Sequence, residues 1–192
     1  MTASDRFGSG TSARLGAIIE PIARAVAMDR ATTLATVLAA LGQSGAFAEP
    51  ALFAPPADGH YTRGRIWTDP DGRFTVVGMT WLPGQGTPVH DHAGRWGAEL
   101  VVRGTMHETS YRLGERDDAG RARLAVERES RVDATQVGVI LPTVDIHAFA
   151  NVGTEVAHTV HVYSTLVDAC TTFTQAGDGW WTPAPAALAF DA

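Results

Sequence analysis

Two histidines separated by one residue form the clearest chemical signal in the sequence. His90 and His92 lie in the run PVHDH at residues 88–92. Side chains alternate between the two faces of a β-strand, so both imidazoles would point the same way, with their Cα atoms about 7 Å apart. Two imidazoles can converge on one metal ion from that spacing. An isolated His-x-His pair is more often two exposed histidines in a loop, so the surrounding residues must decide between these interpretations.

Glycines around the histidine pair match a known motif. Gly84 lies six positions before His90, and Gly104 follows the pair where the next turn is expected. This order resembles the first motif of the cupin superfamily. That motif usually continues with a glutamate ligand, but Gly97 occupies its place here. A metal ion bound at this motif is therefore expected to lack the fourth, carboxylate ligand.

A third histidine lies far along the chain. His147 follows Pro142, precedes Asn151 by four positions and resembles the second cupin motif, although Val144 replaces the usual glycine. Three neutral imidazoles would leave about three positions of an octahedral ion open. An Fe(II) centre that activates O2 needs such positions for substrate and oxygen, whereas three histidines can also bind Zn(II). The geometry alone does not select the metal.

These motifs belong to a longer resemblance. From about Tyr61 to Gln175 the chain resembles the cysteine dioxygenase family of cupins, in its bacterial form. Several independent landmarks occur in the order of that family, and the helical segment before them also fits it. The landmarks are Tyr61-Thr62-Arg63, Trp81, His90-Asp91-His92, Gly104, Glu108-Thr109, His147, Asn151, His161-Val162-Tyr163-Ser164 and Cys170.

The resemblance implies roles for the residues that carry it. His90, His92 and His147 would bind Fe(2+), with O2 as co-substrate. Arg63 would pair with the carboxylate of the substrate, a task that suits the two-pronged guanidinium group. Tyr61 would steady this arginine. Without the resemblance, Arg63 would be interpreted as a solvated charge at a strand edge and Tyr61 as a core aromatic residue.

A second polar group is expected on a later strand. In the run TVHVY at residues 159–163, the valines face one way, while Thr159, His161 and Tyr163 face the other. The plain interpretation is a sheet with a wet outer face. In the family, a matching serine–histidine–tyrosine unit forms a hydrogen-bonded relay near the oxygen site. The resemblance thus implies catalytic roles for His161 and Tyr163, a supporting hydroxyl at Thr159, and packing of Trp81 under the metal-binding strand.

The chain also departs from the better-studied animal enzymes. Those enzymes have a cysteine, crosslinked to the tyrosine, where this chain has Gly97, as bacterial members commonly do. Trp96-Gly97 and the run TPVH at residues 87–90 resemble the 3-mercaptopropionate branch of the family. That branch tends to have glutamine in place of Arg63, so the choice of substrate depends on this arginine.

The expected activity is the addition of O2 to the sulfur of a small thiol carboxylate, with L-cysteine converted to cysteine sulfinate as the first candidate. One alternative is a dioxygenase for 3-mercaptopropionate, mercaptosuccinate or a related thiol acid, in which Arg65 serves a second carboxylate. Another is a non-catalytic cupin that binds a metal or a small ligand.

Helices must precede the β-rich region. Apolar residues recur at helical spacing in two segments. Ser12 is the expected start of the first, Pro21 a bend or a new start within it, and Gly42 the end of the second. The apolar positions are Leu15, Ile18, Ile19 and Ile22 in the first segment and Leu34, Val37, Leu38 and Leu41 in the second.

From Tyr61 onward, short β-rich runs alternate with turn residues. The expected fold is mainly β: a cupin, or double-stranded β-helix (jelly-roll) barrel, with the N-terminal helices packed on it. Residues 1–59 would form the helical cap and linker and residues 60–192 the barrel, in one structural domain, with a loop-like tail around Trp180-Trp181. The expected strands lie at residues 74–81, 99–102, 105–113, 124–126, 137–141 and 156–166.

Composition excludes several classes of protein. The 192 residues are 45% hydrophobic and 19% charged, which suits a packed core. The net charge of −6 and the lack of a basic cluster argue against nucleic acid as a partner. The single cysteine allows no intramolecular disulfide. With neither a secretory signal nor a membrane span expected, we predict a cytoplasmic protein that is a monomer and binds a small thiol carboxylate.

Overall fold

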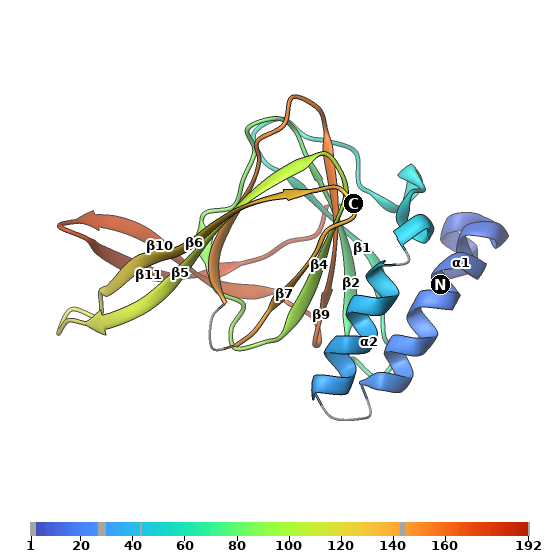
Figure 1. The fold of residues 1–192 in the computed structure, drawn as a ribbon, viewed down its shortest axis with the longest axis horizontal. Helices are drawn as coiled ribbons and strands as arrows, with labels where there is room; N and C mark the ends of the chain where they lie inside the picture. The colour runs from blue at the N-terminus through green and yellow to red at the C-terminus, as the bar shows by residue number, and fades with distance from the viewer. Residues whose placement is uncertain (1–2, 27–29, 43, 143–144, 192) are drawn as a thin grey trace.

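The fold is mainly β, with the helices gathered on one side (Figure 1). The computed structural model describes residues 3–26, 30–42, 44–142 and 145–191. The helices are α1 (Ala3–Ala25), α2 (Arg30–Gly42) and the short 3-10 helices η1 (Ser44–Phe47) and η2 (Pro50–Leu52). The strands are β1 (Thr62–Thr68), β2 (Thr75–Trp81), β3 (Val89–His90), β4 (Gly97–Arg103), β5 (Thr105–Arg116), β6 (Ala122–Asp133), β7 (Val137–Ile140), β8 (Ile146–Asn151), β9 (Ala157–Tyr163), β10 (Ala169–Gly177) and β11 (Trp180–Ala187).

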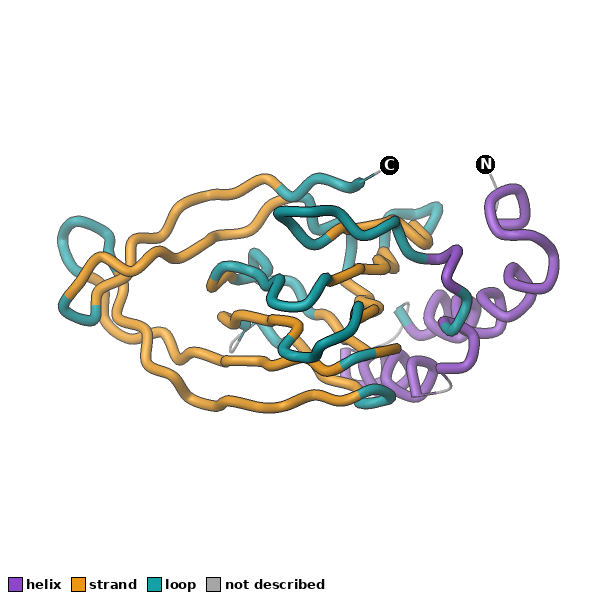
Figure 2. Tube along the Cα trace, turned by 90° about the horizontal axis from the view of Figure 1, so that it is seen from above, coloured by secondary structure: helices purple, strands orange, loops and turns teal. Residues whose placement is uncertain are grey.

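Two antiparallel sheets make up the barrel. The first has the strand order β1-β2-β9-β4-β7, and the second closes into a ring in the order β10-β11-β6-β5-β8-β3. Figure 2 shows the helices gathered at one end of the strands. This mainly β architecture confirms the predicted jelly-roll barrel of the cupin type. Among the described residues, no helix is long and apolar enough to cross a bilayer.

The first sheet is buried on both faces, as β2 illustrates. Val76 belongs to the apolar cluster that the helices share, whereas Val77, Met79 and Trp81 belong to a second cluster inside the barrel. Side chains of a strand alternate between faces, so a fully buried strand needs a cover on each side. The helices provide the outer cover, as predicted. Their contributions to the shared cluster include Leu15, Ile18, Ile22, Val37 and Leu41.

The helix boundaries differ in part from the prediction. α1 begins at Ala3, so Ser12 lies within the helix and does not start it. The glycines before Ser12 are poor helix formers, which is why residues 3–11 show no helical signal. α1 also continues through Pro21 without a new start, and the next residue, Ile22, is fully buried. α2 ends at Gly42 as predicted, and the side chain of Leu34 lies outside the described residues.

The expected strands lack β1, β8, β10 and β11, and the predicted loop-like tail is wrong. Residues 180–187 form β11, which pairs with β10 along its length. Pro183 and Pro185 stand at alternate positions, so the N–H groups that they lack fall on one side of the strand and the intervening residues remain able to pair. β1 and β10 carry many polar residues and glycines, which weakened their strand signal.

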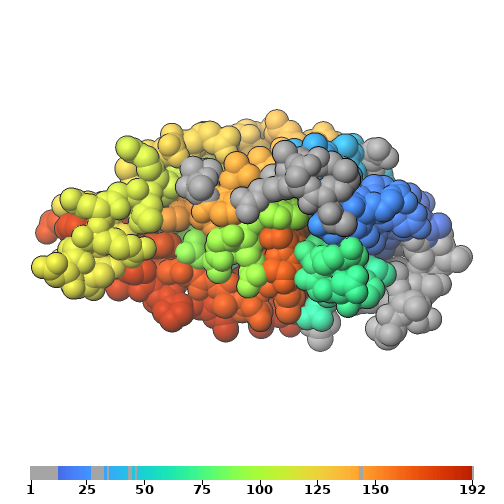
Figure 3. Space-filling model, turned by 90° about the horizontal axis from the view of Figure 1, so that it is seen from below, coloured from blue at the N-terminus to red at the C-terminus, as the bar shows by residue number. Residues whose placement is uncertain are grey.

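Two long hairpins extend the second sheet beyond the barrel. The β5–β6 hairpin and the β10–β11 hairpin meet where Trp180 and Trp181 pair with Arg123 and Ala122. Figure 3 shows their surfaces, coloured yellow and red, touching at one end of the molecule. The arginine side chains of this region stack on Trp180, with Arg123 lying 4.3 Å from its ring centre.

The turn between β1 and β2 is held by one buried carboxylate. Asp69 accepts hydrogen bonds from the Arg73 side chain at 2.8 Å through both of its oxygens, and from the backbone N–H groups of Asp71 and Arg73 at 3.2 Å. The hydrogen bond from Arg73 lowers the pKa of Asp69, more than burial raises it. Arg73 also donates to the carbonyl of Ala23 in α1, so this turn ties the sheet to the helices.

We expect the substitution Asp69→Asn to lower the free energy of unfolding by about 1–3 kcal/mol at pH 7, because it removes a charged acceptor of several hydrogen bonds. The pKa of Asp69 is lower in the folded than in the unfolded protein. Its contribution is therefore present above the unfolded pKa and is lost as the pH falls below roughly 4. Urea unfolding at a series of pH values measures both effects. The matched control is Asp118→Asn in an exposed turn, and equal losses from the two variants would contradict the assignment.

Candidate metal centre

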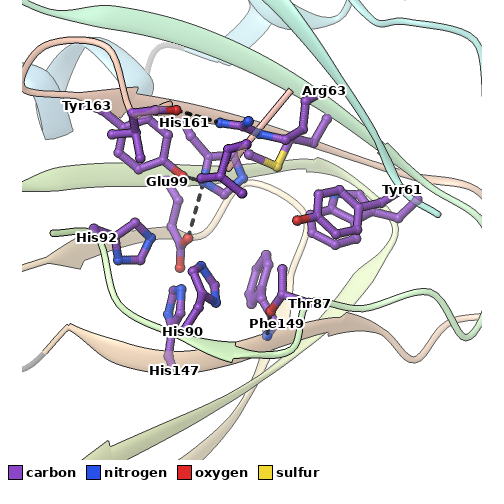
Figure 4. A pocket seen from close by; sticks show the side chains of 14 residues that line it. Tyr61, Arg63, Thr87, His90, His92, Glu99, His147, Phe149, His161 and Tyr163 are labelled. Atoms are coloured by element: carbon purple, nitrogen blue, oxygen red, sulfur yellow. Dashed lines mark hydrogen bonds and ion pairs between the residues drawn. The ribbon is translucent and has the colours of Figure 1, made fainter. Parts of the chain in front are cut away.

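A pocket between the two sheets brings together the predicted site residues (Figure 4). All of them line it except Thr159, which is buried and hydrogen-bonded to His161. The lining residues are Tyr61, Arg63, Met79, Trp81, Thr87, His90, His92, Glu99, His147, Phe149, His161, Tyr163, Val167 and Leu188. The polar side chains thus converge from both sheets into a space that is walled by apolar residues.

Three histidines form a group of donor atoms at one side of the pocket. β3 pairs with β8, so that His90 lies directly opposite His147. His92 follows β3, and its backbone N–H donates to the carboxylate of Asp145 at 3.0 Å. One ring nitrogen from each of the three histidines lies within 4.8 Å of the other two. This donor set fits a single metal ion bound by three imidazoles.

The outer nitrogens of two of these rings are held by neighbours. The Nδ1 atom of His90 lies 3.1 Å from the carbonyl oxygen of Pro88, and that of His147 lies 3.4 Å from the Glu108 carboxylate. Arg128 in turn donates to Glu108 at 2.9 Å. Such partners orient metal-binding imidazoles and leave the opposite nitrogen for the metal. The Nδ1 atom of His92 is buried and has no hydrogen-bond partner among the described residues.

Burial keeps two of the three imidazoles in the neutral form that binds metals. It lowers the pKa of His90 to about 3, with help from the charge of His147, and it lowers the pKa of His92 well below its usual value. Burial also acts to lower the pKa of His147, but the hydrogen bond with Glu108 and the nearby carboxylates outweigh it and raise that pKa. The same hydrogen bond lowers the pKa of Glu108.

A chain of hydrogen bonds runs along β9 on the opposite wall. Trp81 Nε1 donates to the Thr159 hydroxyl at 2.9 Å, and this hydroxyl lies 2.8 Å from His161 Nε2. The Tyr163 hydroxyl lies 3.2 Å from His161 Nδ1. Thr159, His161 and Tyr163 are all buried, which excludes the wet outer face, and His161 and Tyr163 line the pocket.

The chemistry of the donors indicates the direction of this chain. The indole N–H of Trp81 can only donate, so the Thr159 hydroxyl accepts from it and keeps its own hydrogen available for His161 Nε2. Burial lowers the pKa of His161 to about 3, so the ring is neutral, and when Nε2 accepts from Thr159 its one hydrogen lies on Nδ1. The Tyr163 oxygen can then accept from His161. Burial raises the pKa of Tyr163, so its own hydrogen remains available for donation in the pocket.

Arg63 is buried, which rules out the solvated strand-edge charge. Its Nη1 donates to the carbonyl of Ala189 at 3.0 Å, and its Nη2 donates to the carbonyl of Val167 at 3.2 Å. A guanidinium has five N–H groups, so these two bonds orient it without using all its donors. Tyr61 stacks on Trp81, with ring centres 4.3 Å apart. Arg65 does not line the pocket, and its guanidinium lies 4.6 Å from the ring centre of Phe190.

Comparison with known proteins places the chain in a family. A family model described as "Cysteine dioxygenase type I" matches residues 1–176. The chain belongs to this family. It is 28% identical to cysteine dioxygenase type 1 of Rattus norvegicus over 129 residues, and 27% identical to that of Danio rerio over 117 residues. These alignments cover 67% and 60% of this chain, but only 62% and 56% of the relatives.

A structural comparison finds a protein with a double-stranded β-helix domain from Klebsiella pneumoniae subsp. pneumoniae. The two structures agree with a TM-score of 0.44 and 19% sequence identity, over 68% of this chain and 90% of the other.

The family match ends at residue 176, whereas Leu188 of the following segment lines the pocket.

Gly97 lies against the ring of Tyr163. A β-carbon built on Gly97 would lie 2.9 Å from Cδ1 of Tyr163, which is too close for an ordinary contact. Gly97 pairs with Tyr163 across β4 and β9, so the small residue lets the tyrosine ring lie flat on the strand. This cysteine dioxygenase family member therefore holds Tyr163 in place by close packing.

Glu99 is a charged residue of the pocket that was not predicted from the sequence. It lies opposite His161 in the pairing of β4 with β9, and its Oε2 lies 3.5 Å from His161 Nδ1. Burial raises the pKa of Glu99 to about 7. A signal was present, because Glu99 is the one charged residue in the run GAELVV and shares the strand face of Gly97. The cupin motif predicts a ligand position at Gly97 and none at Glu99.

We expect Glu108→Gln to weaken metal binding about 10- to 100-fold, because it removes the charged partner that orients His147. Titration of the metal-free protein with Fe(II) under anaerobic conditions, in competition with a chelating dye, measures the affinity. The matched control is Glu155→Gln, which removes an exposed ion pair with Arg103. Equal affinities for wild type and Glu108→Gln would show that this carboxylate does not support the donor group.

Proposed function

We propose that the protein is a non-haem Fe(II) thiol dioxygenase that adds O2 to the sulfur of a small thiol carboxylate, with L-cysteine as the first candidate. The observation that carries the proposal is the three-histidine donor group facing a buried arginine in one pocket. Membership of the cysteine dioxygenase type I family supports it. The overall reaction converts a thiol and O2 into a sulfinic acid, so both oxygen atoms end on sulfur and no external reductant is needed.

The metal ion and Arg63 would bind different parts of the reactants. An Fe(II) ion bound by His90, His92 and His147 supplies open coordination positions and the redox chemistry of the reaction. Arg63 donates to the substrate carboxylate through the N–H groups that its carbonyl partners leave available. Because those carbonyls orient the guanidinium beforehand, binding the carboxylate also orients the thiol.

The remaining pocket residues position hydrogens and restrict access. Tyr163 accepts a hydrogen bond from His161, and its own hydroxyl hydrogen can be donated to the substrate or to oxygen beside it. The high pKa of Tyr163 keeps that hydrogen in place at neutral pH. The side chains of Met79, Phe149 and Leu188 form apolar walls, which favour small thiols and exclude water.

Oxygen consumption with a panel of thiols tests this function. The iron-loaded protein is given L-cysteine, 3-mercaptopropionate, mercaptosuccinate and cysteamine in an oxygen electrode. We expect about one O2 to be consumed per thiol, with a sulfinate as the product by mass spectrometry, and strong preference for thiols that carry a carboxylate. The zinc-loaded protein is the control. Ligand binding without O2 uptake by any iron-loaded sample would support a non-catalytic cupin instead.

Replacement of Arg63 tests its role as the carboxylate partner. We expect Arg63→Ala to raise the KM for L-cysteine about 10- to 100-fold, since a charged hydrogen bond is lost, while iron content is retained. Arg63→Lys keeps the positive charge but loses the paired N–H donors of the guanidinium, so its KM should lie between those of the wild type and Arg63→Ala. The control is Arg65→Ala, which removes a neighbouring cation that also lies over Phe190. Unchanged cysteine kinetics in Arg63→Ala would show that the carboxylate binds elsewhere.

A further inference from the structure

The carboxyl group of Glu99 has no assigned task in the proposed reaction. Among the residues that line the pocket it is the single acid, and it is only 5% exposed. Its Oε2 has no hydrogen-bond partner among the described residues. Leaving a buried carboxyl oxygen without a hydrogen-bond partner is costly, so its presence in the pocket calls for a ligand that supplies one.

Neighbouring protein groups do not meet this need. His161 Nδ1 lies 3.5 Å from Oε2, but it lies closer, at 3.2 Å, to the Tyr163 hydroxyl, which is its hydrogen-bond partner. The Arg128 guanidinium is engaged with Glu108. Gly138 of β7 leaves room for the other side of Glu99, because a β-carbon there would lie 3.2 Å from Oε1. The side chain therefore packs closely against β7 while it lines the pocket.

The position of Glu99 argues against a role as a fourth metal ligand. Its donor oxygen is grouped with those of Glu108 and His147, whereas the compact group of His90, His92 and His147 does not include it. Figure 4 shows the Glu99 carboxyl between His161 and the three histidines, and Arg63 approaching from the other side of His161 in this view. The pocket thus presents one acid and one permanent cation to the same ligand.

We propose that Glu99 accepts hydrogen bonds from the amino group of the substrate, and thereby selects α-amino thiol acids over thiol acids that lack an amine. This inference rests on the proposed function. An amino group beside the thiol carries the N–H donors that Oε2 lacks, while Arg63 takes the carboxylate. 3-Mercaptopropionate would leave Oε2 unpaired, and the second carboxylate of mercaptosuccinate would repel it.

The test compares Glu99→Leu and Glu99→Gln with the wild type on L-cysteine and 3-mercaptopropionate. We expect the wild type to prefer cysteine. Glu99→Leu should lower kcat/KM for cysteine about 10- to 100-fold, mainly through KM, and leave the value for 3-mercaptopropionate unchanged or higher. Glu99→Gln keeps an acceptor oxygen, so its kcat/KM for cysteine should lie between those of the wild type and Glu99→Leu. The control is Asp69→Asn, another buried acid, which lies outside the pocket and should not change the ratio.

Three results would overturn the inference. These are a wild type that prefers 3-mercaptopropionate, equal losses on both thiols in Glu99→Leu, and loss of iron from that variant, which would make Glu99 a metal ligand. Calorimetric binding of both thiols to the iron-loaded protein without O2 gives a second measurement. If no thiol is turned over, the proposed function fails, but the affinities still test Glu99: a cysteine affinity that Glu99→Leu does not weaken would reject its role.

Discussion

The pairing of β3 with its neighbours is the contact on which the candidate metal centre depends. β3 has only two residues, yet it lies between β10 and β8 and thereby sets His90 opposite His147. The carboxylate of Asp91 accepts a hydrogen bond from the backbone of Thr171, and that of Asp145 accepts one from the backbone of His92. Acidic side chains therefore complete a strand that is too short to hold its place by ladder hydrogen bonds alone.

Two sheets contribute different chemistry to the same pocket. The second sheet carries His90 and His147, whereas the first carries the arginine, the acid and the polar chain of β9. Burial between the sheets has opposite effects on acids and bases, since it raises the pKa of Glu99 and lowers that of His161. Both pKa shifts favour the uncharged forms of these side chains when the pocket holds no ligand. Two buried atoms there, Glu99 Oε2 and His92 Nδ1, have no hydrogen-bond partner among the described residues.

Short-range periodicity accounts for what could be predicted from the sequence. The alternation in the run TVHVY placed Thr159, His161 and Tyr163 on one face of a strand, and the spacing of His90 and His92 placed their imidazoles on the same side. The family resemblance was needed to turn both sets toward the inside of the barrel, where the structure has them. The meeting of His90 and His92 with His147 required the family motifs, because strand pairing over such a separation leaves no local signal. Glu99 was missed because its partner across the sheet, His161, is visible only in the register of β4 with β9. β11 was missed because its prolines resemble those of a loop until the pairing side is known.

Diffraction at the iron absorption edge, on crystals of the protein loaded with Fe(II) without O2, tests the central claim most directly. The account predicts one strong anomalous peak in the pocket, about 2 Å from one nitrogen of each of His90, His92 and His147, with no oxygen of Glu99 in contact with the ion. A peak bound by Glu99 and Glu108 with His147, or no peak in the pocket, would contradict it.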